Sequence, residues 1–194
     1  MKPWLVPSNG IPADVTAKLH AQLPQLETAR LLVRPARLVD YPVWDEIMKG
    51  PNGVFLGGPW DDRGAYLDFA QCVGSWFLRG FGLWAIEDQQ SSKVLGFVAH
   101  GHEYGCLEAE LGFLLIETAQ GRGIATEAAR AVRDYAFSVL KQPSLVLYFD
   151  PRNGASRAVA LKLGATQDLA AETQAKGAAI YRLVPSDGGM EAYT

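Results

Sequence analysis

Apolar residues recur along this chain with two different spacings, and these spacings predict helices and strands in alternation. Steps of three and four residues predict helices from Asp40 to about Gly50, after Asp61 or Asp62, from about residue 124, and over 154–163. Short runs of strand-forming residues predict strands at 30–34, 81–87, 94–102, 106–116, 145–149 and 179–184. This order predicts an α+β fold, a mixed sheet with helices on its faces.

The same periods predict which side chains are buried on the two longest helices. The stripe of the second helix comprises Tyr66, Phe69, Ala70, Val73 and Phe77. The stripe of the third comprises Ala125, Ala128, Ala129, Val132, Ala136 and Val139. Each set recurs at the steps expected of a helix face that packs on a sheet.

The first 26 residues differ from the rest because four prolines interrupt them and no period is sustained. We expect residues 1–25 to form an N-terminal arm laid over one domain at 26–184, with 185–194 as a C-terminal tail. A length of 194 residues suits a single domain with a full core.

Composition excludes several classes of protein. The net charge of −3 argues against nucleic-acid binding, which needs a concentrated basic face. No apolar run is long enough to span a bilayer, and early prolines make a signal peptide improbable. Cys72 and Cys106 lie in no metal or redox motif, so we expect buried, reduced thiols in a cytoplasmic protein.

The segment Gln120–Ala125 has the features of an anion site. Gly121 and Gly123 allow a ligand to approach bare backbone where a strand passes into a helix. The first helical amides lack intrahelical partners and, with the helix dipole, favour a pyrophosphate, which the Arg122 side chain could also reach. A plain strand–turn–helix corner would use the same glycines. A Walker loop is absent, and Thr126 occupies the third small-residue position of the dinucleotide fingerprint.

Several motifs together resemble the GNAT family of N-acetyltransferases. Gln120-x-x-Gly123-x-Ala125 matches the motif that receives the CoA pyrophosphate. The segment 153–164, from Asn153 to Gly164, resembles the second block, in which an Asn contacts the pantetheine arm. Residues 26–31 and the strand containing Arg182 resemble the two ends of the RimJ/RimL-like branch, which includes enzymes that acetylate protein N-termini.

The resemblance implies a mostly antiparallel sheet with helices on both faces and a splayed strand pair, 106–116 and 145–149, for CoA. Acetyl-CoA would be the cosubstrate and an amine, either a peptide N-terminus or a small molecule, the acceptor. The cofactor-binding residues would be Phe113, Leu114 and Leu115 through their main chain, together with Gln120, Gly121, Arg122, Gly123, Ile124, Ala125, Thr126, Asn153 and Ser156. The sequence leaves the oligomeric state open, with a homodimer as one option.

The sequence departs from many members of the family in the helix after Asn153. Those members carry a tyrosine as general acid at the place of Ala160, and no tyrosine occurs over 154–164. Ser156, or a water that it holds, is the best remaining proton donor to the thiolate. A CoA thiol with a pKa of ~8.5 is also tolerable as a leaving group without an acid.

The acceptor amine has a pKa near ~10.4 and must lose a proton before it attacks. Glu110 lies on the strand that leads to the thioester, and Glu108 shares its face by alternation. We predict Glu110 as the base, with Glu108 and Glu103 as alternatives. A solvent-facing or Arg-paired strand carboxylate would look the same in the sequence.

Two histidines and an aromatic loop complete the candidate residues. His100 and His102 share a strand face, but no third ligand is evident, so we predict no metal site. Phe55 and Trp60, beside Asp61 and Asp62, would form an acidic, aromatic rim that suits a cationic amine, although a solvated turn explains the two aspartates equally well.

The resulting hypothesis is an acetyl-CoA-dependent N-acetyltransferase with direct attack by the amine. A covalent acetyl-enzyme would need a nucleophile with an adjacent base, which neither cysteine has in the sequence. The non-enzymatic alternative is an acyl-CoA-binding regulatory module that has lost turnover.

Overall fold

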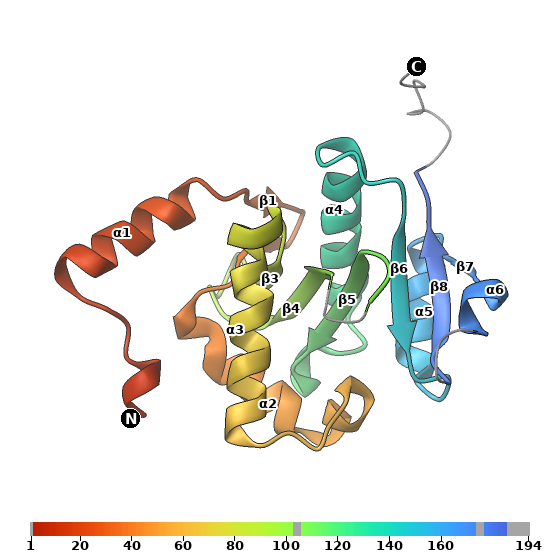
Figure 1. Ribbon diagram of the computed structural model, residues 1–194, viewed down its shortest axis with the longest axis horizontal. Coiled ribbons are helices and arrows are strands. Elements are labelled where there is room, and N and C mark those ends of the chain that lie inside the picture. Colours follow the sequence, from red (N-terminus) through yellow and green to blue (C-terminus); the bar gives the residue numbers. More distant parts are fainter. Residues whose placement is uncertain (1, 103–105, 174–176, 186–194) are drawn as a thin grey trace.

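The computed structural model describes residues 2–102, 106–173 and 177–185 (Figure 1). The strands are β1 (Leu26–Glu27), β2 (Leu31–Pro35), β3 (Leu83–Asp88), β4 (Val94–Gly101), β5 (Glu110–Leu115), β6 (Leu145–Phe149), β7 (Thr166–Gln167) and β8 (Ala179–Leu183). The α-helices are α1 (Gly10–Ala21), α2 (Tyr41–Lys49), α3 (Asp62–Arg79), α4 (Ile124–Ser138), α5 (Gly154–Lys162) and α6 (Leu169–Glu172). Short 3₁₀ helices are η1 (Pro3–Leu5), η2 (Leu38–Asp40), η3 (Pro51–Leu56) and η4 (Glu117–Ala119).

One sheet joins the strands in the order β1-β2-β3-β4-β5-β6-β8-β7. Neighbouring strands are antiparallel except β5 and β6, which run parallel. The α+β class and the mostly antiparallel sheet predicted from the sequence are therefore confirmed.

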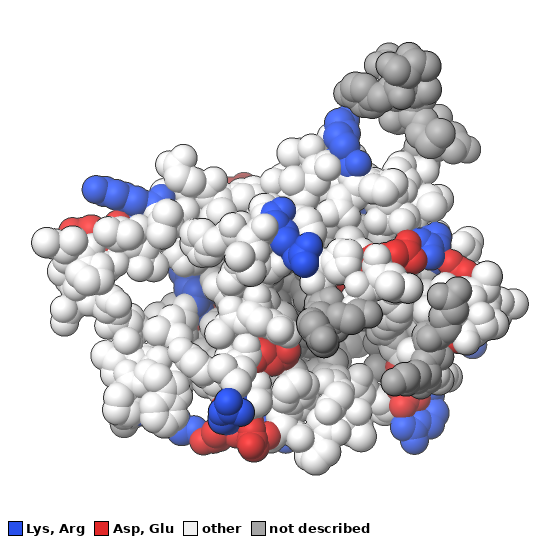
Figure 2. Space-filling model, viewed as in Figure 1, with Lys and Arg blue, Asp and Glu red and all other residues white. Residues whose placement is uncertain are grey.

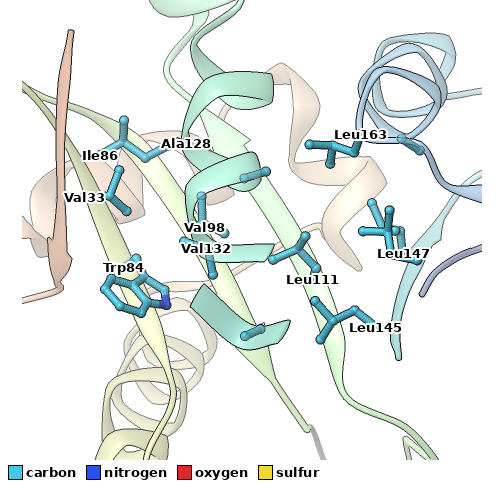
Figure 3. Close-up of a cluster of buried hydrophobic side chains, with 14 of the residues drawn as sticks. Val33, Trp84, Ile86, Val98, Leu111, Ala128, Val132, Leu145, Leu147 and Leu163 are labelled. Carbon is cyan, nitrogen blue, oxygen red and sulfur yellow. The ribbon is translucent and has the colours of Figure 1, made fainter. Parts of the chain in front are cut away.

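Alternation along the strands divides the core between the two faces of the sheet. In β3, Trp84 and Ile86 are buried toward α4 and α5, whereas Leu83 and Ala85 are buried toward α2 and α3. Figure 3 shows the first of these clusters, in which α4 contributes Ala128 and Val132. Helices thus cover both faces, and the sheet between them is held rigidly by apolar packing.

The buried stripe of α4 follows the predicted period, with one exception. Ala128, Ala129, Val132 and Ala136 are fully buried, and their small side chains let the helix lie close to the sheet. Val139 is exposed because α4 ends at Ser138, before the stripe reaches it.

The stripe predicted for α3 is partly wrong. Phe69 is buried and Tyr66 and Val73 pack against the core, as predicted, but Ala70 and Phe77 are exposed. The other buried positions of the helix are Ala65 and Trp76. The Trp76 indole Nε1 donates to the Leu83 carbonyl at 3.0 Å, so this large side chain packs against β3.

One predicted boundary also needs correction, and one helix start is built differently from what its sequence suggests. The strand expected over 106–116 is formed only from Glu110 to Leu115, because the chain at Glu108 bends to pair with Arg182. Asp40 precedes α2, but its carboxylate does not cap that helix. It accepts from the buried Arg34 guanidinium at 2.8 Å and from the Arg37 amide at 2.7 Å.

The N-terminal arm contains a helix that the sequence pattern did not indicate. Pro12 lies in the first turn of α1, where a missing N–H does not interrupt the helix. No residue of α1 is buried, and Figure 1 shows this helix standing away from the sheet instead of lying over the domain.

Candidate active site

The parallel strands β5 and β6 touch at only one end. Among the described residues a single register pair, Glu110 with Val146, joins them, and the Val146 amide donates to the Ala109 carbonyl at 3.0 Å. Beyond this pair the strands diverge toward their carboxyl ends (Figure 1). The splayed pair implied by the family resemblance is therefore present in the fold.

Arg182 of β8 fixes the closed end of this splay. Its Nη2 donates to Glu108 Oε1 at 2.8 Å, and its Nε donates to Asp168 Oδ2 at 2.7 Å. The hydrogen bond from Arg182 lowers the pKa of Glu108 and keeps that carboxylate charged. Glu108 therefore belongs to a structural ion pair, and its predicted sharing of a strand face with Glu110 is wrong.

A cavity of about 160 Å³ lies along the open end of the splay, and we call it the cleft cavity. Eight of the predicted site residues line it: Phe113, Leu114, Leu115, Gln120, Gly121, Ala125, Asn153 and Ser156. Arg122, Gly123, Ile124 and Thr126 lie next to it in the chain without lining it. Ile124 is buried in the core, so only its main chain could serve a ligand.

The turn that leads into α4 has the geometry that an anion requires. Gly121 and Gly123 have φ of 71° and 77°, in the left-handed region where a side chain is strained. A Cβ at Gly121 would meet no atom within 4 Å, so open space lies beside its backbone. Since α4 begins at Ile124, its first amides point toward this turn, and the segment fits a pyrophosphate.

Arg30, which precedes β2, connects this turn to the first turn of α4 through hydrogen bonds. Its Nε donates to Glu127 Oε2 at 2.8 Å, and its Nη1 donates to the Arg122 carbonyl at 3.2 Å. Thr28 Oγ1 donates to the other Glu127 oxygen at 2.6 Å. Burial alone would raise the pKa of Glu127, but the hydrogen bonds from Thr28 and Arg30 outweigh it and lower that pKa.

The start of α5 supplies the second wall of the cleft. Asn153 caps the helix, because its Oδ1 accepts from the Ser156 amide at 3.0 Å. Both residues also line the cleft cavity, so the cap and a ligand contact are compatible. Ala160 is fully buried in the core.

A second cavity of about 240 Å³ adjoins the cleft cavity, and we call it the acidic cavity. The two cavities share six lining residues: Phe55, Leu56, Phe113, Leu114, Asn153 and Ser156. The carboxylates of Glu110 and Asp68 line the acidic cavity together with Tyr148. Of the three candidate bases, only Glu110 is placed in it: Glu108 is paired with Arg182, and Glu103 lies outside the described residues.

Tyr148 and Asp68 are site residues that sequence reasoning missed. Burial raises the pKa of the Tyr148 hydroxyl, which stays protonated at neutral pH. Alternation along β6 could have indicated Tyr148, because it lies between the buried Leu147 and Phe149. Asp68 carries a weaker signal, a charge between the buried Ala65 and Phe69 of α3.

The predicted aromatic rim is only partly assembled. Phe55 lines both cavities, whereas Trp60 lies in another hollow and donates from Nε1 to the Leu56 carbonyl at 3.0 Å. Asp61 caps α3 by accepting from the Gly64 amide at 2.6 Å, and Asp62 pairs with Lys2 and Lys49. These two carboxylates therefore do not form the acidic rim that we expected.

The two histidines line a third cavity, of about 150 Å³, that is separate from the acidic cavity and the cleft cavity in its histidine lining. His100 is fully buried and stacks on Phe81 with ring centroids 4.3 Å apart, and burial lowers its pKa to about 4. His102 Nε2 lies 2.9 Å from the Cys106 carbonyl oxygen. Within 2–102, 106–173 and 177–185, no group of three or more His, Cys, Asp or Glu side chains could hold a metal ion.

Cys72 and Cys106 are half-buried, less enclosed than we expected.

Comparison with known proteins assigns this arrangement to a family. Residues 30–166 match the model of the acetyltransferase (GNAT) domain, which is most of the chain. The chain belongs to the GNAT acetyltransferase family. It is an acyltransferase, and its family membership implies acetyl transfer from acetyl-CoA.

Solved structures agree with this assignment. The acetyltransferase from Agrobacterium tumefaciens str. C58 is 36% identical, with a TM-score of 0.79 over 84% of this chain and 96% of that one. RimL, a ribosomal L7/L12 α-N-protein acetyltransferase solved in complex with coenzyme A, shares the fold at 19% identity. Its TM-score is 0.64 over 83% of this chain and 98% of its own.

A curated relative matches part of the chain. YkkB of Bacillus subtilis (strain 168), a protein without an assigned activity, is 35% identical over 91 residues, or 44% of this chain. The chain spans 52% of that relative's length in the match.

Surface charge and helix composition add two observations. On the face drawn in Figure 2, acidic and basic side chains are scattered among uncharged ones. Among the helices of the described residues, none combines the length and the apolar character needed to cross a membrane.

Proposed function

We propose that this enzyme transfers the acetyl group of acetyl-CoA to a primary amine by direct attack in a ternary complex. The acceptor would be a peptide N-terminus or a small-molecule amine. The observation that carries this proposal is that the cleft cavity and the acidic cavity meet at Asn153 and Ser156. A donor along the cleft would present its reactive end at the mouth of a cavity that holds carboxylates.

The residues of the cleft would bind the donor mainly through main chain. Acetyl-CoA, when bound, supplies an acetyl group activated as a thioester. The amides after Gly121 would hold its pyrophosphate, and the β5 edge from Phe113 to Leu115 would hydrogen-bond its pantetheine arm in place of a neighbouring strand. Asn153 would contact the same arm from α5.

Glu110 would remove the proton from the acceptor amine, directly or through a water. It lines the acidic cavity at the closed end of the splay, where it is itself paired with Val146 of β6. An ammonium group cannot attack, so a carboxylate at this position would both attract the cation and accept its proton.

Two hydroxyl groups could return a proton to the departing sulfur. Ser156 lines both cavities, and Tyr148 lines the acidic one. The raised pKa of Tyr148 suits a donor that must be protonated at neutral pH. Because the family's usual tyrosine is replaced by Ala160, Tyr148 is a second candidate for this role from a different element.

The rival covalent route would use Cys72, which lines the acidic cavity one helical turn after Asp68. If transfer is direct, the Cys72→Ala variant should keep its acetyltransferase activity. If transfer goes through an acetyl-enzyme on this thiol, the variant should lose that activity completely.

The proposed function is tested by acetyl-CoA consumption against a panel of amines, with mass spectrometry of the products. Glu110→Gln should lower kcat about 10²- to 10⁴-fold at neutral pH, and the loss should shrink as pH rises and free amine becomes abundant. Glu108→Gln is the matched control, because that carboxylate is occupied by Arg182. If no amine yields an acetylated product, the proposal fails. If Glu110→Gln keeps full activity at all pH values, Glu110 is not the base.

A further inference from the structure

Asp68 is a charged residue of the acidic cavity for which the proposed chemistry has no use. It lies on α3, three residues after Ala65 and four before Cys72, on a stripe that faces the cavity. Its carboxylate Oδ1 accepts a hydrogen bond at 3.0 Å from Gln71 Nε2, a neutral group. Burial raises the pKa of Asp68, because a half-buried carboxylate without a cation is poorly solvated.

The acidic cavity has an unbalanced charge. Its lining, taken over the described residues, contains the carboxylates of Asp68 and Glu110 and no lysine, arginine or histidine. Asp68 differs in this respect from two nearby carboxylates, because Asp62 pairs with Lys2 and Lys49, and Asp45 also pairs with Lys49. A cationic ligand would therefore gain from both carboxylates that face this cavity.

Apart from Tyr148, Asn153 and Ser156, most of the remaining lining is apolar. Trp44, Met48 and Leu56 contribute aromatic and aliphatic surface from α2 and η3. Such surface suits methylene groups, and aromatic rings also attract ammonium groups.

We propose that Asp68 binds a second positive charge on the acceptor, so that the preferred substrate is a small amine with two cationic groups separated by methylenes. This inference rests on the proposed function and assigns its substrate class. Glu110 serves the amine that reacts, and Asp68 serves the amine that does not. Asp68 is thus a specificity-determining residue, and acceptors with a carboxylate near the amine are disfavoured by repulsion.

The test compares α,ω-diamines with n-alkyl monoamines of the same chain length. We expect the native enzyme to have a kcat/KM for the best diamine about ten- to a hundredfold above that for its matched monoamine, the range for a hydrogen-bonded charge pair. Asp68→Asn should bring this ratio close to one, chiefly by lowering kcat/KM for the diamine. Asp62→Asn, at the start of the same helix but outside the cavity, should leave the ratio unchanged.

A second variant protects the test against a simple loss of stability. Asp68→Glu keeps the charge and moves it inward by one methylene, so the preferred diamine should become shorter by about one methylene. A native enzyme that acetylates monoamines and diamines equally well overturns the inference while the proposed function stands. A preference for diamines that survives Asp68→Asn also overturns it. Failure to acetylate any amine overturns both.

Discussion

Arg30 and Glu127, which are 97 residues apart in the chain, hold the glycine turn before α4 between them. The Arg30 amide and side chain both donate to the Glu127 carboxylate, and the same guanidinium reaches the Arg122 carbonyl inside the turn. The N-terminal edge of the sheet is therefore tied directly to the first turn of α4. Through this contact, residues distant from the ligand can set the geometry of the glycine turn.

We expect Glu127→Gln to weaken acetyl-CoA binding without removing it. The pair is partly exposed and should be worth about 1 kcal/mol, which corresponds to about a fivefold rise in Kd. Calorimetric titration with CoA measures this change. Asp134→Asn, which breaks a pair with Arg133 further along α4, is the matched control and should leave Kd unchanged. Equal Kd values for both variants would mean that the pair of Arg30 and Glu127 has no role in binding.

Gly121→Asp should abolish the rise in melting temperature that CoA produces. A ligand at a hundredfold excess over Kd stabilises the folded state by about 2.7 kcal/mol, and a carboxylate beside the turn would repel the pyrophosphate. Gly80→Asp is a close control. Gly80 has φ of 78° and, like Gly121, open space at its Cβ, but it ends α3 away from the cleft. Both variants should lose stability from backbone strain, and only Gly80→Asp should still respond to CoA.

Tyr148→Phe and Ser156→Ala distinguish the two candidate proton donors. Loss of the donor should lower kcat with little change in KM for acetyl-CoA, whereas loss of a binding contact should raise KM. The defect should be smaller with an acetyl donor whose thiol has a lower pKa, because that leaving group needs less protonation. Steady-state kinetics with two such donors give the answer. If neither variant changes kcat by more than about threefold, no side-chain acid assists the sulfur.

Arg182→Gln should make the protein less stable and its stability less sensitive to acid. In the native protein the pKa values of Glu108 and Asp168 are lowered by hydrogen bonds, from Arg182 for Glu108 and chiefly from the Ala171 amide for Asp168. A lowered folded-state pKa contributes stability that is complete above the ordinary carboxyl range and lost as pH falls through the folded-state pKa. Melting temperatures below about pH 5 should therefore fall less steeply in the variant. An unchanged slope would contradict this assignment.

The sheet and its helices could be predicted from periodicity because each face of the sheet buries a continuous apolar layer. The exceptions arise where one tertiary contact overrides a local pattern. In α3, Trp76 is buried because it packs against β3 and bonds to Leu83. Glu108 lies outside the strand expected for it and pairs with Arg182. The sequence alone does not show which distant residues will be in contact in the folded protein.

In the candidate site, too, some residues could be predicted from the sequence and others could not. The residues of the glycine turn and the start of α5 could be predicted because their function depends on local backbone geometry at adjacent positions. Asp68 and Tyr148 could not, because each comes from a different element and only the cavity brings them together with Glu110. The charges that were conspicuous in the sequence, Asp61 and Asp62, serve a helix cap and surface ion pairs.

The single pairing of Glu110 with Val146 is also a point about which one half of the sheet could rotate against the other, because β4 holds β5 along its whole length. From that point β5 extends to Leu115, a lever of about 17 Å at ~3.3 Å per residue. A rotation of only about 5° at the pivot would move the far end by roughly 1.5 Å, and misplacement by ~1 Å can cost about a hundredfold in rate. The alignment of the two reactants therefore depends on how firmly the sheet holds this one pairing.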